Sequence, residues 1–289
     1  MKIARSLAVL AASAVILGLT TLDAASASKL ALSAPPNDSI NSATRLGAPP
    51  ATYVEDTSKA THNSTDGKCV GGSSVWFRSR SAVTRTVRLS TVGSDYSTTL
   101  AVFSGPKSNR TLIGCASGFL DEGSFGFAAR QVRFVAGKTY WVAVSACCGR
   151  GATGGQLVLN TWRPTAAGIS ATIESVETGT VSGELLVTGT VRCKTPSAYE
   201  VQVSASERVA DGANVASGGG YVDDVCGPTS KSWSLVIDSN TGWAFQPGTA
   251  RLTQVAFVYD GFGSAQAGPE ANNFDVTANP NARSSHTVS

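Results

Sequence analysis

Short apolar runs separated by turn residues are the feature that most constrains the fold of this sequence. The runs alternate with a period of two or are wholly apolar, as in SVWFRSR (74–80), TVRLST (86–91) and QLVLNTW (156–162). After residue 27, no stretch sustains the i, i+3, i+4 apolar spacing of an amphipathic helix. About fifteen such strands in roughly 250 residues predict an all-β chain of two antiparallel β-sandwiches in tandem.

A proline-containing stretch divides the chain near its middle. NTWRPTAAGIS (160–170) ends one series of strands at Trp162 and inserts Arg163-Pro164 before the next run near Ile169. Proline cannot donate to a strand ladder, and the small residues around it suit a short linker. We therefore predict one sandwich over 35–163, a second over 167–279, and a disordered tail over 280–289.

The first 27 residues have the pattern of a secretory signal peptide. Lys2 and Arg5 precede an apolar run over 6–21, and Ala25-Ser26-Ala27 is a cleavage signature. The run is shorter than the roughly 20 residues that span a bilayer. The sequence therefore predicts a secreted, extracellular protein that forms disulfides and does not insert into the membrane after cleavage.

The charge of the chain excludes one class of partner. The formal net charge is only +3, and the basic residues are scattered along the sequence. Nucleic-acid binding needs a concentrated positive surface. We therefore expect no nucleic-acid partner, and we expect a monomer.

The order of motifs in the first half resembles the bacterial pre-peptidase C-terminal domain. The motifs are PPNDSINSATRL (35–46), GGSSVWFRSRS (71–81), TVRLSTVGSDYSTTLAVFSG (86–105), VRFVAGKTYWVAVSA (132–146) and GGQLVLNTW (154–162). The resemblance covers nearly all of the first half. It implies a small, non-catalytic antiparallel sandwich of jelly-roll type that accompanies secreted hydrolases or adhesive proteins. Some such domains bind extracellular polymers, and some hold calcium.

The second half more loosely resembles an immunoglobulin-like secreted domain, and this likeness implies a fold alone. Its motifs are VTGTVRC (187–193), VCGPTSKSWSLVI (225–237) and FQPGTARLTQVAF (245–257).

Two apolar runs of the first half show how its strands are expected to pack. The run 100–103 is apolar on both faces, as in a central strand covered on each side. Gly137 is expected in a tight turn, where a positive φ costs glycine little. The strand after it divides into two faces, with Tyr140, Val142 and Val144 on one and Trp141 and Ala143 on the other.

Six cysteines follow the leader, and we expect all of them to form disulfides: Cys69, Cys115, Cys147, Cys148, Cys193 and Cys226. If successive strands reverse direction, the first four gather at one pole of the first sandwich. Adjacent residues on a strand point to opposite faces, so Cys147 and Cys148 can reach different partners. This topology favours two bridges from the adjacent pair to Cys69 and Cys115, and it leaves open which cysteine pairs with which.

The same four cysteines allow three alternatives. A vicinal Cys147–Cys148 bond beside a Cys69–Cys115 bond would strain the peptide within its small ring. A four-cysteine zinc site usually spaces its paired ligands two to four residues apart, which adjacency fits badly. A redox motif is disfavoured because the chain has no C-x-x-C. In the second half, a Cys193–Cys226 bridge would close a loop of about 33 residues and contribute roughly 3–4 kcal/mol.

The sequence predicts that the protein is not an enzyme, with no catalytic residue. The chain has two histidines, His62 in a polar loop and His286 in the tail. It lacks a G-x-S-x-G elbow, an H-E-x-x-H motif and a P-loop. The acidic pairs Asp121-Glu122 and Asp223-Asp224 are adjacent residues in turn-like stretches, so we interpret them as solvated loop residues rather than a glycosidase pair.

No cofactor is expected, with calcium as the one possibility to test. Asn37, Asp38, Asp121 and Glu122 offer the hard oxygen ligands that calcium prefers. The resemblance implies such a role for Asn37 and Asp38. The competing interpretation is that both residues cap a turn after Pro35-Pro36.

Binding is the function that these observations favour. Aromatic side chains in turn-like segments are candidates for an exposed binding surface, because flat rings stack on the apolar faces of sugars; they are Tyr96, Tyr221, Trp243, Tyr259 and Phe262. Each of them also fits partial packing against its own sandwich. The sequence thus predicts a secreted protein that binds an extracellular polymer, either polysaccharide or protein. The alternative is an accessory or inhibitory module of a secreted hydrolase or peptidase.

Overall fold

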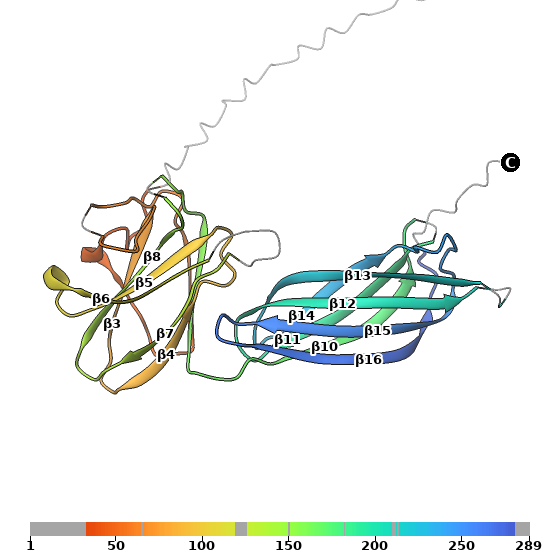
Figure 1. Cartoon of the computed structure of the whole chain (residues 1–289). Coiled ribbons are helices and arrows are strands. Elements are labelled where there is room, and N and C mark those ends of the chain that lie inside the picture. Colours follow the sequence, from red (N-terminus) through yellow and green to blue (C-terminus); the bar gives the residue numbers. More distant parts are fainter. Residues whose placement is uncertain are drawn as a thin grey trace, which may run out of the picture. The chain divides into compact units, whose positions relative to one another are not determined.

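The structure, a computed structural model, describes residues 33–280 except 65, 119–125, 150, 182, 210–211 and 213. Among these residues the chain forms sixteen strands and two short 3-10 helices, which confirms the all-β prediction (Figure 1). The predicted leader lies outside the described residues, as do Asp121, Glu122, His286 and the tail after residue 280. No helix in the described part of the chain has the length and apolar character needed to cross a membrane.

The first half is built from two sheets. One sheet has the order β1 (Thr44–Arg45), β3 (Ser74–Arg80), β8 (Thr139–Ala146), β5 (Thr98–Ser104) and β6 (Thr111–Ser117). The other has the order β2 (Ala51–Asp56), β9 (Gln156–Trp162), β4 (Arg85–Ser90) and β7 (Ala129–Phe134). All pairings are antiparallel except that of β1 with β3. Consecutive strands often change sheet, so Gly137, with φ +74°, turns the chain between two sheets rather than within a hairpin.

The core of the first sandwich lies between these sheets and follows the predicted alternation. The inward residues of β5 are Leu100 and Val102, and they pack with Tyr140, Val142 and Val144 of β8. Residues of β4, β7 and β9 meet them from the opposite sheet. The two-face assignment of β8 is therefore confirmed.

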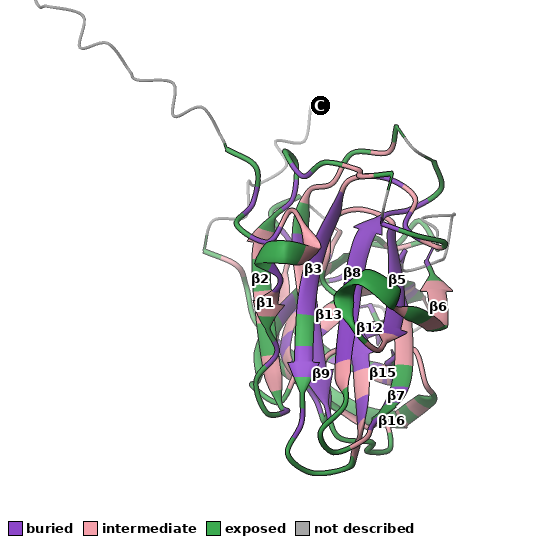
Figure 2. Cartoon of the chain, turned by 90° about the vertical axis from the view of Figure 1, so that its left-hand side faces the viewer, coloured by how far each residue is buried: buried purple, intermediate pink, exposed green. Residues whose placement is uncertain are grey.

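A second apolar layer covers the outer face of the larger sheet. We call it the outer cluster, and it consists of Ala43, Val70, Trp76, Ala101, Phe103, Trp141 and Ala143. The helix η1 (Ile40–Ser42) and the preceding segment supply part of its cover, and the backbone N–H of Trp76 donates to the Asn37 carbonyl at 2.9 Å. Figure 2 shows β3, β8 and β5 as largely buried strands, with exposed helical turns in front of them. This sheet is therefore buried on both faces.

The second half is also a sandwich of two antiparallel sheets. The smaller sheet has the order β10 (Ile169–Thr178), β11 (Leu185–Cys193) and β14 (Lys231–Ile237). The larger has the order β13 (Val215–Cys226), β12 (Ser197–Arg208), β15 (Gly248–Tyr259) and β16 (Ser264–Val276). Alternate residues of both sheets form one core that includes Tyr199, Leu185, Ile237 and Leu252. No sheet in the described residues joins strands from both halves, and the strands fall within the bounds 35–163 and 167–279.

The turn between β15 and β16 contacts residues of the first half. Asp260 is completely buried, and its carboxylate accepts hydrogen bonds from the backbone N–H groups of Phe262 at 2.9 Å and Gly263 at 3.0 Å. The same carboxylate pairs with Arg88 of β4 at 3.3 Å. The Arg88 guanidinium lies 4.6 Å from the centre of the Phe262 ring, which also packs edge-on against Trp162. The turn between β15 and β16 therefore contacts the first half through both an ion pair and aromatic packing.

Candidate functional site

All six cysteines are bonded, as predicted, but two of the pairings differ from those that we favoured. Cys69 pairs with Cys115, and Cys147 pairs with its neighbour Cys148. Cys193 pairs with Cys226 as expected. The structure thus has the vicinal arrangement that the sequence allowed as an alternative.

The length of β6 explains the difference. Cys115 does not end its strand, because β6 continues to Ser117. Cys115 lies opposite Ala101, which lies opposite Ala143 on β8. Cys147 is four residues beyond Ala143, which places it about 13 Å further along the strand direction. Cys115 instead shares the outer face of the sheet with the outer cluster, against which Cys69 also packs.

A histidine, an aspartate and a serine meet at one carboxylate, but the serine hydroxyl donates to the aspartate and not to the imidazole, unlike in a catalytic triad. His62 Nδ1 lies 3.7 Å from the Asp66 carboxylate, which also accepts a hydrogen bond from the Ser74 hydroxyl. Asp223 and Asp224 lie within β13 and not in a turn as expected, and Asp224 pairs with Lys231. Asp223 and Asp224 point to opposite faces because they are adjacent in a strand.

Of the four predicted calcium ligands, the structure describes only Asn37 and Asp38. Both oxygens of Asp38 accept hydrogen bonds from Thr61, one from its backbone N–H and one from its hydroxyl. Asn37 is fully buried, and its side-chain amide lies beside the Glu55 carboxylate, whose pKa it lowers against the larger effect of burial. Calcium takes six to eight oxygen ligands, and no group of three or more acidic, histidine or cysteine side chains in the described residues is arranged to hold a metal. The remaining predicted ligands, Asp121 and Glu122, lie outside the described residues.

Two of the five predicted binding aromatics are engaged in packing. Burial raises the pKa of Tyr96 to about 12, and the Tyr96 hydroxyl accepts a hydrogen bond from Thr57 at 3.0 Å. Phe262 lies between Arg88 and Trp162, as described above. A third aromatic, Trp243, is 46% exposed in the segment between β14 and β15.

The other two predicted aromatics share one surface, the outer face of the sheet β13-β12-β15-β16. Tyr221 of β13 is 64% exposed and Tyr259 of β15 is 45% exposed. The covered side of the Tyr259 ring packs against Phe127, with ring centres 5.9 Å apart. Phe257, which is 37% exposed, lies two residues before Tyr259 and therefore faces the same way. Phe257 was not among the predicted binding residues, although its alternation with Tyr259 in QVAFVYD (254–260) places both on one face. We call Tyr221, Phe257 and Tyr259 the aromatic group of this face.

Polar side chains accompany the aromatic group. Asp223 of β13 lies opposite Glu200 of β12, which lies opposite Phe257. In the next row, Tyr221 lies opposite Gln202. A hollow of about 190 Å³ opens beside the rings and is lined by Ala198, Tyr199, Glu200, Phe257, Val258, Tyr259 and Ser264. The strands of this sheet appear in the order β13, β12, β15, β16 in Figure 1. This face combines exposed rings with hydrogen-bond acceptors and a shallow depression.

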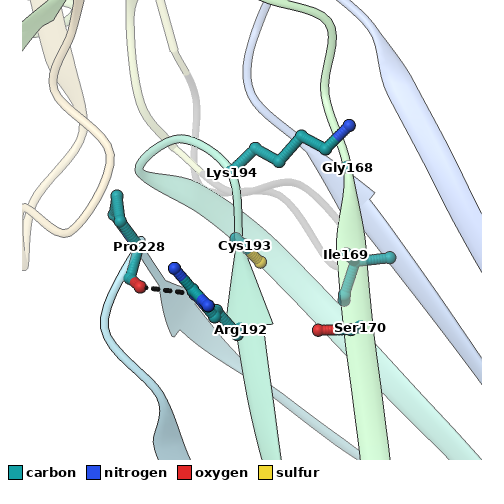
Figure 3. Close-up of a pocket in the computed structure, with 7 residues that line it drawn as sticks. All are labelled: Gly168, Ile169, Ser170, Arg192, Cys193, Lys194 and Pro228. Atoms are coloured by element: carbon teal, nitrogen blue, oxygen red, sulfur yellow. Dashed lines mark hydrogen bonds between the residues drawn. The ribbon is translucent and has the colours of Figure 1, made fainter.

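A second hollow, of about 440 Å³, opens at one end of the smaller sheet (Figure 3). It contains two cations, Arg192 and Lys194. Arg192 Nε donates to the Pro228 carbonyl at 2.7 Å, whereas the Lys194 side chain extends beside Gly168. The two charged groups point in different directions in Figure 3. The two cations do not point toward one position where a single ligand could contact both, so we assign no ligand to this hollow.

Comparison with known proteins does not place the chain in a family. No protein-family model matches the sequence, and no curated protein matches it. Among solved structures, it shows a partial likeness to β-glucuronidase 3 of Bacteroides uniformis, at 13% identity over 70% of this chain and 27% of that chain, with a TM-score of 0.21. A β-D-mannosidase from Dictyoglomus thermophilum is similar at 12% identity over 70% and 29% of the two chains, with a TM-score of 0.24. A GH2 β-galacturonidase from Eisenbergiella tayi is similar at 14% identity over 72% and 36%, with a TM-score of 0.22.

The chain thus spans little more than a third of the length of these enzymes at most. Similarity at this level carries no argument about the activity of this chain.

Proposed function

We propose that this is a secreted, non-catalytic protein that binds an extracellular polysaccharide on the outer face of the sheet β13-β12-β15-β16. The observation that carries the proposal is the exposure of Tyr221, Phe257 and Tyr259 on one face. Tyr221 and Phe257 belong to no core cluster, and Tyr259 keeps 45% of its side chain exposed beside Phe127. Grouped apolar side chains on a surface mark sites of interaction.

The chemistry of the face suits a sugar chain. The apolar face of a pyranose ring can stack on Tyr221, Phe257 or Tyr259, and the carboxylates of Glu200 and Asp223 can accept hydrogen bonds from its hydroxyl groups. Strand geometry places the Cα atoms of Phe257 and Tyr259 about 7 Å apart, and those of Phe257 and Tyr221 about 12 Å apart. A ligand that contacts all three rings must therefore be longer than one sugar ring.

The covalent structure is consistent with export. Three disulfides join the six cysteines, and such bonds persist in oxidising compartments. Together with the leader pattern of residues 1–27, this supports an extracellular location. Within the proposal, the first sandwich is a pre-peptidase C-terminal-like domain and the second an immunoglobulin-like domain.

The proposal is tested by titrating neutral oligosaccharides of increasing length into the protein in a calorimeter. We expect Tyr221→Ala and Phe257→Ala each to weaken binding several-fold, because one stacked ring contributes about 0.5–1.5 kcal/mol. Trp243→Ala is the matched control, since this exposed ring lies off the face, and it should leave the affinity unchanged.

Three results would overturn parts of the proposal. If no polysaccharide binds, or if the Tyr221→Ala/Phe257→Ala double variant binds normally, the face is not the site. If shortened sugars are released during the titration, the protein is not merely a binder. If the protein inhibits or docks to a secreted peptidase and binds no sugar, the accessory-module alternative replaces it.

A further inference from the structure

The other end of the same sheet face carries a basic hollow. Seven residues line a depression of about 320 Å³: Ser206, Glu207, Arg208, Val215, Thr249, Arg251 and Asn273. We call it the arginine hollow. Apart from Val215, the lining side chains that face outward can donate hydrogen bonds: two guanidinium groups, an amide and two hydroxyl groups.

Sheet register brings the two arginines together. Glu207 lies opposite Ala250, so Arg208 is diagonal to Arg251 on the neighbouring strand. Diagonal partners on one face are about 7–8 Å apart, within the reach of long side chains. Like charges so placed repel each other unless an anion lies between them.

Neither guanidinium has a carboxylate partner in the described residues. Arg208 donates only a long hydrogen bond, 3.4 Å, to the carbonyl of Gly212, and Arg251 forms no ion pair there. Glu207 also lines the hollow, but its side chain alternates to the inner face of β12 and is buried. Its carboxylate accepts a hydrogen bond from the backbone N–H of Gln246 at 3.1 Å. The acid nearest in register is Asp275, which lies opposite Thr249. Among the described residues that face outward here, one acid, Asp275, accompanies two arginines, so the outward-facing side chains carry a net positive charge.

We propose that the arginine hollow binds a carboxylate group of the polysaccharide, so that the ligand is an acidic polymer such as a uronate-containing chain. The planar guanidinium fork matches a planar carboxylate. This inference rests on the proposed function. Arg251 precedes Phe257 by six residues on β15, so the hollow and the aromatic group are roughly 20 Å apart. The ligand therefore contacts rings at one end of the face and places an acidic group at the other.

The test compares two oligosaccharides of equal length, one neutral and one carrying carboxylates. The wild-type protein should bind the acidic one about tenfold more tightly, the size of one charge-assisted hydrogen bond. Arg251→Gln and Arg208→Gln should each reduce this preference while leaving affinity for the neutral sugar unchanged. Arg192→Gln, an exposed arginine on the other sheet, is the matched control and should change neither. Added salt screens the charges, so it should reduce the ratio of the affinity for the acidic sugar to that for the neutral sugar.

The outcomes separate this inference from the proposed function. Equal affinity for both sugars, or a preference for the acidic sugar that persists in Arg251→Gln, would refute carboxylate binding in the arginine hollow. Either result would leave sugar binding by the aromatic group unaffected. If neither sugar binds, the proposed function fails, and the arginine hollow is then tested separately by NMR titration with inorganic sulfate. Shifts of the Nε resonances of Arg208 and Arg251 would support an anion site there. The absence of such shifts would refute it. Preferential binding of a carboxylate-terminated peptide over the acidic sugar would also overturn the inference.

Discussion

The disulfides of the protein should differ widely in their contribution to stability. A disulfide stabilises mainly by closing a loop in the unfolded chain. Cys193–Cys226 spans 33 residues and Cys69–Cys115 spans 46, so each should contribute about 4 kcal/mol. Cys147–Cys148 joins neighbours and closes no loop of the chain, so we expect its removal to leave the free energy of unfolding nearly unchanged.

The perturbation is a set of paired substitutions. Cys69→Ala/Cys115→Ala removes one long-range bond. Cys147→Ala/Cys148→Gly removes the vicinal bond, and glycine is chosen at 148 because Cys148 has φ +77°. Urea unfolding followed by tryptophan fluorescence gives the free energy of unfolding of each variant.

The result that would refute this reasoning is a loss of several kcal/mol on removal of Cys147 and Cys148. Bridges from this pair to Cys69 and Cys115 would each close a long loop and contribute about 4 kcal/mol. A large loss would therefore indicate the crossed pairing, and peptide mapping of the oxidised protein would identify it directly.

Three further predictions concern buried positions. A Cβ at Gly189 would clash with the backbone carbonyl oxygen of Thr172 and lie 2.5 Å from the ring of Trp233. Gly189→Ala should therefore lower the free energy of unfolding by about 1–3 kcal/mol in urea titrations, and an unchanged midpoint would contradict the close packing. Asp260→Ala should lower the free energy of unfolding by about 3–5 kcal/mol, because the substitution leaves Arg88 without its buried partner. Thermal unfolding at constant pH measures this loss, and an unchanged stability would refute the pairing. Burial raises the pKa of Glu207 above its ordinary value of 4.5, against a smaller opposing effect of its backbone hydrogen bond. The Glu207 carboxyl therefore keeps its proton to higher pH in the folded state than in the unfolded state, so the free energy of unfolding should fall as pH rises just above 4.5. Glu207→Gln should make this fall smaller. An unaltered pH dependence of stability in this variant would contradict the prediction.

Much of the fold could be predicted because it depends on local patterns. The alternation after Gly137 assigns Trp141 and Val142 to opposite faces, and the structure places them in the outer cluster and the inner core. The break at Arg163-Pro164 falls between β9 and β10. These features depend on side-chain periodicity and on the missing N–H of proline, both of which can be read from the sequence.

What could not be predicted depends on contacts between distant residues. Strand pairing decides that Cys115 lies opposite Ala101 and away from the pole where Cys147 lies. The same applies to the candidate site. Tyr221 and Phe257 come from strands that are not neighbours in the sheet, and only the register through β12 shows that they share a face. Phe262 appeared equally exposed in sequence, yet it packs against Trp162, a hundred residues earlier in the chain.

The outer cluster has a consequence for processing of the protein at its amino-terminal side. Ala43 belongs to the cluster and Ile40 packs against it, so the segment around η1 covers part of the layer that contains Trp76 and Trp141. A protease that trimmed the chain past this segment would uncover two indole rings on an otherwise sealed sheet. We expect such a shortened form to associate through these rings, so the chain should tolerate amino-terminal trimming only as far as a few residues before Ile40.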